Sequence, residues 1–228
     1  MQRKKWYLLL GISSVIILLL IYNITNYYFS YKKDLELKRE IEKYDFDDLK
    51  NINSDIVGFI EVENTDINYP IVQSNDNSYY LNHAYDKEKN EIGSIFLDYR
   101  NDLNNLSRNN IIYGHGRLDN TMFGSLNNLL DEDVLNDKDN FYITITTPDE
   151  IMKFQIFSVY TIDKESYYIK TYFSNNRYFK EFLETIMKRS IYNFKTSVST
   201  SDVILTLSTC KDNFGKRIVV HAKKEETS

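Results

Sequence analysis

One thiol and one guanidinium, seven residues apart, are the side chains whose types and spacing most directly suggest chemistry. The stretch TLSTCKDNFGKR, from Thr206 to Arg217, contains Cys210, the only cysteine in the 228 residues. A guanidinium close to a sulfur favours the thiolate, and it can hold the oxyanion that forms when the sulfur attacks a carbonyl. The pair therefore indicates a cysteine nucleophile. The alternative role for the thiol is that of a small buried hydrophobic residue.

A β-hairpin would bring these two residues together. The β-rich run VILTLSTC ends at Cys210, and the run RIVVHAK begins at Arg217, with KDNFG and a lysine between them. In an antiparallel pair, Arg217 lies across from the end of the first strand. Because side chains alternate along a strand, Leu205 and Leu207 face the core, whereas Ser208 and Cys210 face the opposite side. The sequence thus predicts a thiol outside the main core, beside Arg217.

A cysteine nucleophile usually works with a base, and three histidines could serve. His115 lies between two glycines in IIYGHGR, at the end of a strand-like run, where the glycines leave the imidazole uncrowded. His221 lies on the same predicted strand and face as Arg217 and is the second candidate. His83, in YLNHAYD, is expected to make structural hydrogen bonds. Chemistry alone favours His115 over His221.

The first residues predict a protein that is exported and held in a membrane. Three cationic residues precede an apolar run from Trp6 to Tyr22, which is near the lower limit of roughly 17 residues for crossing a bilayer. A cleaved signal peptide is the alternative, but the run ends in IYNITNYYF, which has no small-residue cleavage site. Because cationic residues stay inside, the N-terminus is expected in the cytoplasm and the rest of the chain outside the cell.

Three parts are predicted along the chain. Residues 1–26 form the cytoplasmic N-terminus and the anchor, residues 27–53 a juxtamembrane helical region, and residues 54–228 the catalytic domain. Residues 31–44 are charged, and they fit either an amphipathic helix or a solvated spacer. The net charge of −5 and the pI near 5.3 argue against a nucleic-acid-binding protein. No metal-ligand cluster stands out in the sequence, so no cofactor is expected.

The sequence after residue 54 predicts a mainly β domain. Several short β-rich runs, separated by turn signals and without βαβ alternation, indicate about eight strands in a mostly antiparallel sandwich or closed barrel. The clearest helix is expected over Arg177 to Ser190, before the cysteine strand. Its apolar stripe, at the spacing of a surface helix that packs on a core, consists of Phe179, Phe182, Leu183, Ile186 and Met187.

Taken together, these segments resemble the class B sortases. TLSTC followed by KRIVV is similar to the active-site hairpin of that family. Four further segments are similar to sortase segments in the same order, namely DIVGFIEVENTDINYPIVQSNDNSYYLNHAYD, GSIFLDYRN, NIIYGHG and MFGSL. The resemblance covers Ser54 to Lys223. It implies a sortase-type closed β-barrel of about eight strands, with N-terminal helices and one helix in the insertion before the cysteine strand.

The resemblance also implies an activity, a set of site residues and a location. It implies a cysteine transpeptidase that cleaves a C-terminal sorting pentapeptide after Thr through a thioacyl-enzyme and transfers the surface protein to a peptidoglycan amine. Matched by motif, Cys210 is the nucleophile, His115 the acid and base, and Arg217 the oxyanion or substrate-positioning group. The implied location is the cell membrane of a Gram-positive bacterium, crossed once. The implied substrate-binding residues are Ser208, Tyr167 and Tyr168.

Two other functions share some of these features. An L,D-transpeptidase-like wall enzyme also has His, Cys and Arg in this order. Such enzymes resemble a pattern with Gly just before the cysteine and Arg two residues after it, whereas here Thr209 precedes Cys210 and the arginine comes seven residues later. A membrane-tethered, non-catalytic binding module would carry an inert thiol. It predicts that Cys210→Ala leaves function unchanged.

Overall fold

The chain divides into two units, residues 1–43 and residues 44–228. The first unit contains α1 (Gln2–Ile41), a continuous helix of 40 residues. Within it, Leu9–Phe29 is long and apolar enough to cross a membrane by length and composition. At a rise of 1.5 Å per residue, α1 is about 60 Å long, roughly twice the hydrocarbon thickness of a bilayer. The computed structural model describes residues 2–41, 46–131, 141–163, 165–209 and 216–226.

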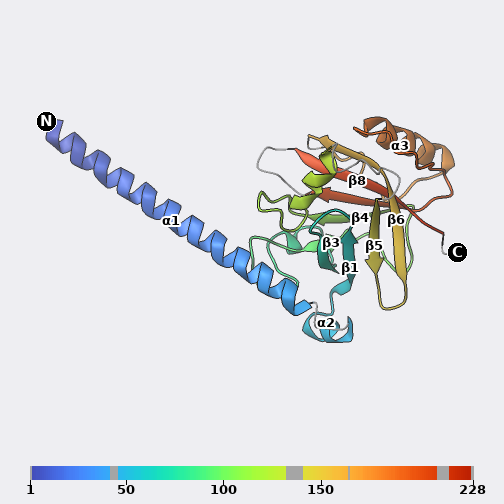
Figure 1. Ribbon diagram of the computed structural model, residues 1–228, viewed down its shortest axis with the longest axis horizontal. Coiled ribbons are helices and arrows are strands. Elements are labelled where there is room, and N and C mark those ends of the chain that lie inside the picture. Colours follow the sequence, from blue (N-terminus) through green and yellow to red (C-terminus); the bar gives the residue numbers. More distant parts are fainter. Residues whose placement is uncertain (1, 42–45, 132–140, 164, 210–215, 227–228) are drawn as a thin grey trace. The chain divides into compact units, whose positions relative to one another are not determined.

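The second unit is a closed barrel of eight strands, ordered β1-β2-β3-β4-β7-β8-β6-β5 around the barrel (Figure 1). Two neighbouring pairs, β2–β3 and β4–β7, are parallel, and the others are antiparallel. The prediction of a mostly antiparallel closed barrel is therefore confirmed. The strands are β1 (Ile56–Val62), β2 (Asn68–Val72), β3 (Ile95–Leu97), β4 (Asn109–Gly114), β5 (Tyr142–Thr146), β6 (Ile151–Ile162), β7 (Ile204–Thr209) and β8 (Arg217–Lys224).

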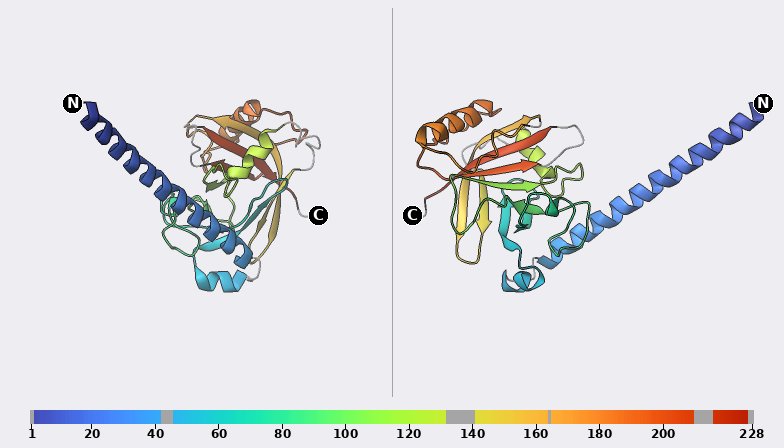
Figure 2. Two further views of the ribbon diagram at one scale, coloured as in Figure 1. Left: turned by 60° about the vertical axis from the view of Figure 1, so that its left-hand side comes forward. Right: turned by 180° about the vertical axis from the view of Figure 1, so that it is seen from behind.

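Helix α3 (Asn176–Arg189) lies in the connection between β6 and β7, outside the barrel (Figures 1 and 2). The side-chain oxygen of Asn175 accepts hydrogen bonds from the backbone N–H groups of residues 177 and 178, which caps the helix. Four of the five predicted stripe residues are buried, and Met187 is exposed. Among the described residues of this unit, the short helices are α2 (Phe46–Ile52) and two 3₁₀ helices, η1 (Tyr79–Leu81) and η2 (Gly124–Leu130).

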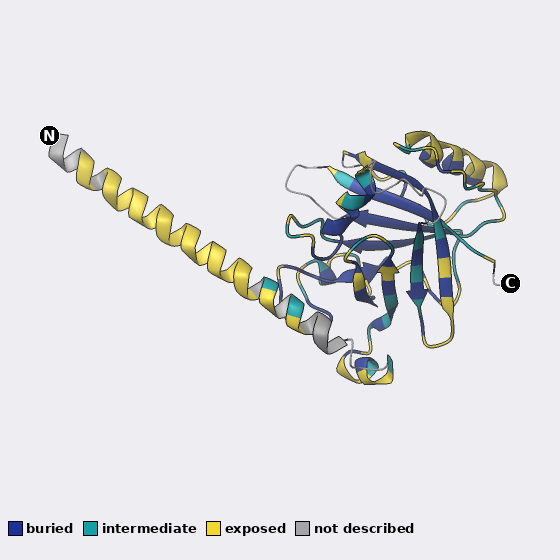
Figure 3. Ribbon diagram, viewed as in Figure 1, coloured by how far each residue is buried: buried dark blue, intermediate teal, exposed yellow. Residues whose placement is uncertain are grey.

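Two hydrophobic cores result from this arrangement. The larger one fills the barrel and includes Leu205 and Leu207 of β7. The smaller one lies between the outer wall of the barrel and the β6–β7 connection, and it includes Ile204 of β7 and Phe182 of α3. Figure 3 shows α3 buried on one side and exposed on the other. The faces of β7 are as predicted, but every residue of β7 is buried because the insertion covers the outer face.

Candidate active site

Strand β7 is flanked by β4 on one side and by β8 on the other, and the register of both pairs converges on one strand end. In the parallel β4–β7 pair, Gly114 lies beside Thr209. In the sequence, His115 follows Gly114 and Cys210 follows Thr209. In the antiparallel β7–β8 pair, Ser208 lies opposite residue 219, and β8 begins two residues earlier, at Arg217. Cys210 itself lies outside the described residues.

His115 is half-buried and is held by one backbone group. Its Nε2 lies 2.7 Å from the carbonyl oxygen of Leu81. A carbonyl oxygen only accepts, so Nε2 carries the hydrogen of this bond, and Nδ1 is the nitrogen left to exchange a proton. The close approach depends on Gly93, which has φ of +67°. A Cβ there would lie 2.8 Å from the Leu81 oxygen and 3.0 Å from Cδ2 of His115.

The glycine after His115 lies close to the end of β7. A Cβ on Gly116 would lie 3.2 Å from both Cβ and Cγ2 of Thr209, which is tighter than most Cβ contacts. Gly116 therefore lets the chain after β4 pack against the last residue of β7. This glycine allows close approach of two strand ends.

Arg217, the first residue of β8, joins two of the predicted substrate-binding residues. Its Nη1 donates to the hydroxyl of Tyr168 at 3.1 Å, and that hydroxyl lies 3.0 Å from Oγ of Ser208. Ser208 and Tyr168 are completely buried, and Arg217 is half-buried. The three residues thus form one hydrogen-bonded chain on the outer face of the barrel.

Tyr167 is not part of the hydrogen-bonded set of Arg217, Tyr168 and Ser208. Its hydroxyl donates to the hydroxyl of Tyr160 at 2.7 Å, and the guanidinium of Arg189 lies 4.4 Å from its ring centre. The two adjacent tyrosines therefore contact different surroundings, with Tyr168 beside Arg217 and Tyr167 beneath α3.

Comparison with known proteins identifies the family. The sortase domain family matches residues 60–225. The sortase B of Listeria monocytogenes (serovar 1/2a, strain EGD-e) is 42% identical over 180 residues, which cover 77% of this chain and 72% of the relative. The chain belongs to the class B sortases. Sortases of this class are cysteine transpeptidases of the cell surface that anchor surface proteins to the cell wall, and this sortase has that function.

Solved structures of sortase B agree with the fold. A complex of Staphylococcus aureus sortase B with substrate has a TM-score of 0.74 and 37% identity, covering 86% of this chain and 93% of that one. A sortase B complexed with triglycine has a TM-score of 0.75 and 36% identity, covering 87% of this chain and 96% of that one. The family match decides against both the L,D-transpeptidase and the non-catalytic binding module.

A buried polar network fastens the insertion of this sortase to the barrel wall. The hydroxyl of Tyr160 lies 2.9 Å from Nε2 of His221, and Nδ1 of His221 lies 2.8 Å from Oγ1 of Thr206. Thr206 donates to Oδ1 of Asn109 at 2.6 Å, so its oxygen accepts from His221. The hydroxyl of Tyr160 accepts a hydrogen bond from the hydroxyl of Tyr167 and donates one to Nε2 of His221. All these bonds are satisfied only if His221 is neutral and protonated on Nδ1.

The other end of the network reaches the insertion backbone. Nδ2 of Asn109 donates to the carbonyl oxygens of Tyr168, at 3.1 Å, and Lys170, at 2.9 Å. The segment that carries Tyr167 and Tyr168 is therefore held from below by β4 of the barrel. This network also removes His221 as a base for the substrate, because the side chain is 0% exposed and both ring nitrogens are occupied.

We expect the stability of this sortase to depend on His221 below neutral pH. Burial lowers the pKa of His221 to about 3, whereas an unfolded histidine has a pKa near 6.5. The unfolded state therefore binds the extra proton first, and stability falls as the pH drops below about 6.5. Between pH 6.5 and 4.5 this group alone should cost about 2–3 kcal/mol of unfolding free energy. Urea unfolding at several pH values measures the slope.

His221→Gln is the matched control for that slope, because glutamine can hydrogen-bond but does not titrate. Its unfolding free energy should change less between pH 6.5 and 4.5 than that of the wild type. Equal slopes for the two proteins would show that His221 is not the titrating group.

A second tie holds the insertion from the side of β3. The buried carboxylate of Asp98 accepts from Nε of Arg100 at 2.8 Å, from Nη2 at 2.7 Å, from the Tyr113 hydroxyl at 3.0 Å and from Nδ2 of Asn77 at 2.9 Å. Burial by itself raises the pKa of Asp98, but the hydrogen bonds and the charge of Arg100, together with the Tyr113 hydroxyl, hold that pKa below its usual range. Nη2 of Arg100 also donates to the carbonyl oxygen of Ile169 at 3.0 Å.

Arg100→Ala should lower the unfolding free energy by about 1–3 kcal/mol, because it leaves the buried carboxylate of Asp98 without its charged donor. The loss should be much smaller in an Asp98→Asn background, where no charge is stranded. Urea unfolding of the four proteins of this cycle measures the coupling. Arg177→Ala removes an exposed arginine and should change stability by no more than about 0.5 kcal/mol. An equal loss from Arg100→Ala in both backgrounds would contradict the stabilising interaction between Arg100 and Asp98.

Sequence reasoning missed the residues that hold the predicted ones. Leu81 and Arg100 act through contacts with residues 34 and 69 positions away in the chain, and no local pattern marks such pairs. Among the described residues, no group of three or more His, Cys, Asp or Glu side chains could hold a metal ion.

Proposed function

We propose that Cys210 is the nucleophile of this sortase, His115 its acid and base, and Arg217 the donor that stabilises the oxyanion. The strand register is the observation that supports this assignment most directly. Thr209 pairs with Gly114 on one side, and the β7–β8 register runs toward Arg217 on the other. Cys210 follows Thr209 directly in the sequence, and consecutive Cα atoms are about 3.8 Å apart.

The proposed reaction has two halves. In the first, the sulfur of Cys210 attacks the carbonyl carbon of the Thr in a C-terminal sorting pentapeptide, and the guanidinium of Arg217 faces the oxyanion. The bond to the next residue breaks, its amine takes a proton from His115, and a thioester remains. In the second half, an amine attacks the thioester and gives its proton to His115. The thiolate leaves, and the surface protein is joined to the amine.

The proposed partners are surface proteins that carry a sorting signal and an amine of peptidoglycan or its precursor. A solved sortase B holds triglycine, a peptide with a free amine, and this supports the second partner. For attack by the amine to be faster than hydrolysis, the thioester must be shielded from solvent. The buried Tyr168 and Ser208 beside Arg217 supply a dry wall on one side.

We also propose that this sortase is anchored in the membrane of a Gram-positive bacterium by residues 1–26, with the N-terminus in the cytoplasm. Residues 27–53 then form the juxtamembrane region, and residues 54–228 form the extracellular catalytic domain. The apolar Leu9–Phe29 stretch of α1 and the cationic residues before it support this arrangement.

The experiment that tests the proposed reaction uses the full chain in detergent with a panel of fluorogenic sorting peptides. Peptides are incubated with and without pentaglycine, and the products are weighed by mass spectrometry. We expect cleavage after Thr, and with pentaglycine a product in which the peptide is joined through a new amide. Cleavage at another bond, or no joined product with any peptide, would argue against the proposed reaction.

A further inference from the structure

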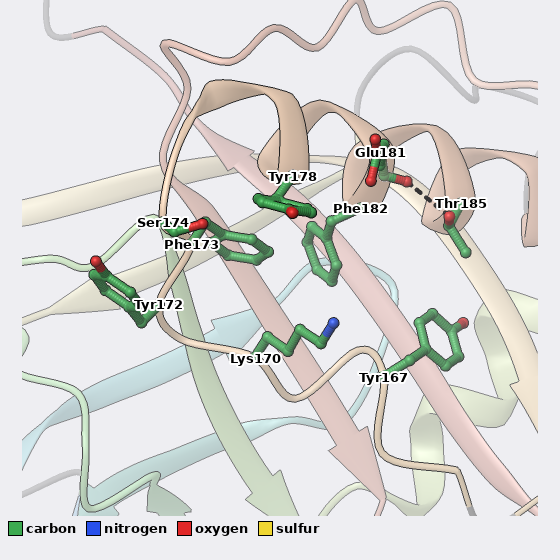
Figure 4. Close-up of a pocket in the computed structure, with 9 residues that line it drawn as sticks. All are labelled: Tyr167, Lys170, Tyr172, Phe173, Ser174, Tyr178, Glu181, Phe182 and Thr185. Atoms are coloured by element: carbon green, nitrogen blue, oxygen red, sulfur yellow. Dashed lines mark hydrogen bonds between the residues drawn. The ribbon is translucent and has the colours of Figure 1, made fainter.

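A hollow of about 800 Å³ lies on the outside of the barrel, between α3 and the chain segment before it (Figure 4). It is a size that suits a peptide or another small ligand. Aromatic side chains make up most of its walls. The lining residues are Tyr167, Lys170, Tyr172, Phe173, Ser174, Tyr178, Glu181, Phe182 and Thr185.

The two charged groups of this hollow, which we call the α3 hollow, differ in their surroundings. Glu181 has a partner on its own helix, because Nε of Arg177 lies 4.0 Å from its carboxylate. Lys170 forms no ion pair with any carboxylate in the described part of the chain. Figure 4 shows its ammonium group pointing into the space between α3 and the segment that carries Tyr167. The α3 hollow therefore has a lysine ammonium that is not ion-paired with any described residue, beside aromatic rings.

Two of the hydroxyl groups that line the hollow are bonded within the protein. The hydroxyl of Thr185 donates to the backbone oxygen of Glu181 at 2.7 Å, and the hydroxyl of Tyr167 donates to Tyr160. The ammonium of Lys170 is the positively charged donor of the hollow, and the hydroxyls of Tyr172, Ser174 and Tyr178 also line it. A carboxylate is the peptide group that matches this ammonium, because the pair is charge-assisted.

The α3 hollow lies on the other side of the segment that borders the proposed active site. Tyr167 lines the hollow, whereas its neighbour Tyr168 contacts Arg217. Lys170 is two residues from Tyr168, so their Cα atoms are at most about 7 Å apart. An extended peptide of five residues spans about 17 Å, which is long enough to pass around this segment. The side with Ser208 and Arg217 is assigned to the sorting peptide, which leaves the α3 hollow for the second substrate.

We propose that the α3 hollow binds the acceptor of the transfer reaction, a peptide that carries the attacking amine and also a free carboxylate. Lys170 pairs with the carboxylate, and the aromatic walls contact the body of the peptide. This inference rests on the proposed function, because it names where the amine substrate of that reaction is held.

The test compares two acceptors, pentaglycine with a free carboxylate and pentaglycinamide, which has the same amine without the negative charge. Full-length enzyme in detergent joins each acceptor to one sorting peptide. The KM for pentaglycine should be about three- to fivefold lower than for the amide, as expected for one partly exposed ion pair. Lys170→Ala should remove this preference, and Lys170→Glu should reverse it. The preference should also shrink in 1 M salt.

Lys180→Ala is the matched control, because it removes the same charge from the exposed, Glu184-paired side of α3. This variant should keep the preference for the free carboxylate. Hydrolysis of the sorting peptide without acceptor should be unchanged in all variants. A wild type without preference, a preference that survives Lys170→Ala, or a change only in the KM of the sorting peptide would overturn the inference. Failure of the proposed function would be distinct, because hydrolysis itself would then be missing.

Discussion

Cys210→Ala is expected to abolish both cleavage and transfer of sorting peptides, with a loss of at least about 10³-fold in kcat/KM. The reason is that no other group of the proposed site can form the thioester on which both halves of the reaction depend. Binding and the remaining donors can leave only a small residual rate. Product analysis by mass spectrometry measures the loss. It should also detect an acyl-enzyme in the wild type and none in the variant.

The single cysteine makes the control for this prediction simple. An alkylating reagent that reacts with thiols can modify only Cys210, so labelling and loss of activity should follow the same time course in the wild type. Circular dichroism and the urea midpoint should show that Cys210→Ala is folded. A folded variant that still cleaves the peptide at the same bond would refute the nucleophile.

His115→Ala should lower kcat by about 10²- to 10⁴-fold for both the hydrolysis and the transfer reaction. This is the usual contribution of a positioned acid and base, and each half of the reaction needs one proton transfer. The Leu81 carbonyl fixes Nε2 as a donor, so Nδ1 is the nitrogen proposed to transfer the proton. Steady-state kinetics of peptide hydrolysis and of transfer measure the two losses.

His83→Ala is the matched control for the imidazole. The ring of His83 stacks on Tyr79 with ring centres 4.0 Å apart, and its Nδ1 lies 2.7 Å from the Tyr79 carbonyl oxygen. These contacts give it the structural role that the sequence predicted, so we expect His83→Ala to lower kcat much less than His115→Ala does. A His115→Ala enzyme with a nearly normal rate, or a His83→Ala enzyme with the larger loss, would contradict the assignment.

The features that could be predicted from the sequence are those that depend on local periodicity. Alternation along VILTLSTC places Leu205 and Leu207 in the barrel core and Ser208 on the outer face, and the structure agrees. The spacing of apolar residues predicted α3 within one residue at each end. The position of Arg217 at the start of β8 followed from the short connection, because a hairpin pairs residues at equal distances from its turn.

Other features depend on contacts between distant segments. The outer face of β7 was expected to lie outside the core, but the insertion covers it, so Thr206 is buried and bonded to His221. Nothing local in the sequence shows that Arg100 meets the carbonyl oxygen of Ile169, since the partner is a backbone group and the separation is 69 residues. Burial of polar side chains is visible only when the elements that satisfy them are in place.

The two separate cores have a consequence for how this enzyme can change. The barrel core holds the strands whose ends carry His115 and Arg217, and the outer core holds α3 and the segment with Tyr168. Substitutions that reshape the outer layer can therefore alter substrate choice while the proposed reacting groups keep their spacing. Such an architecture permits new specificities to evolve by exchange of one external segment, provided that Asn109, which fastens it, keeps its two backbone acceptors.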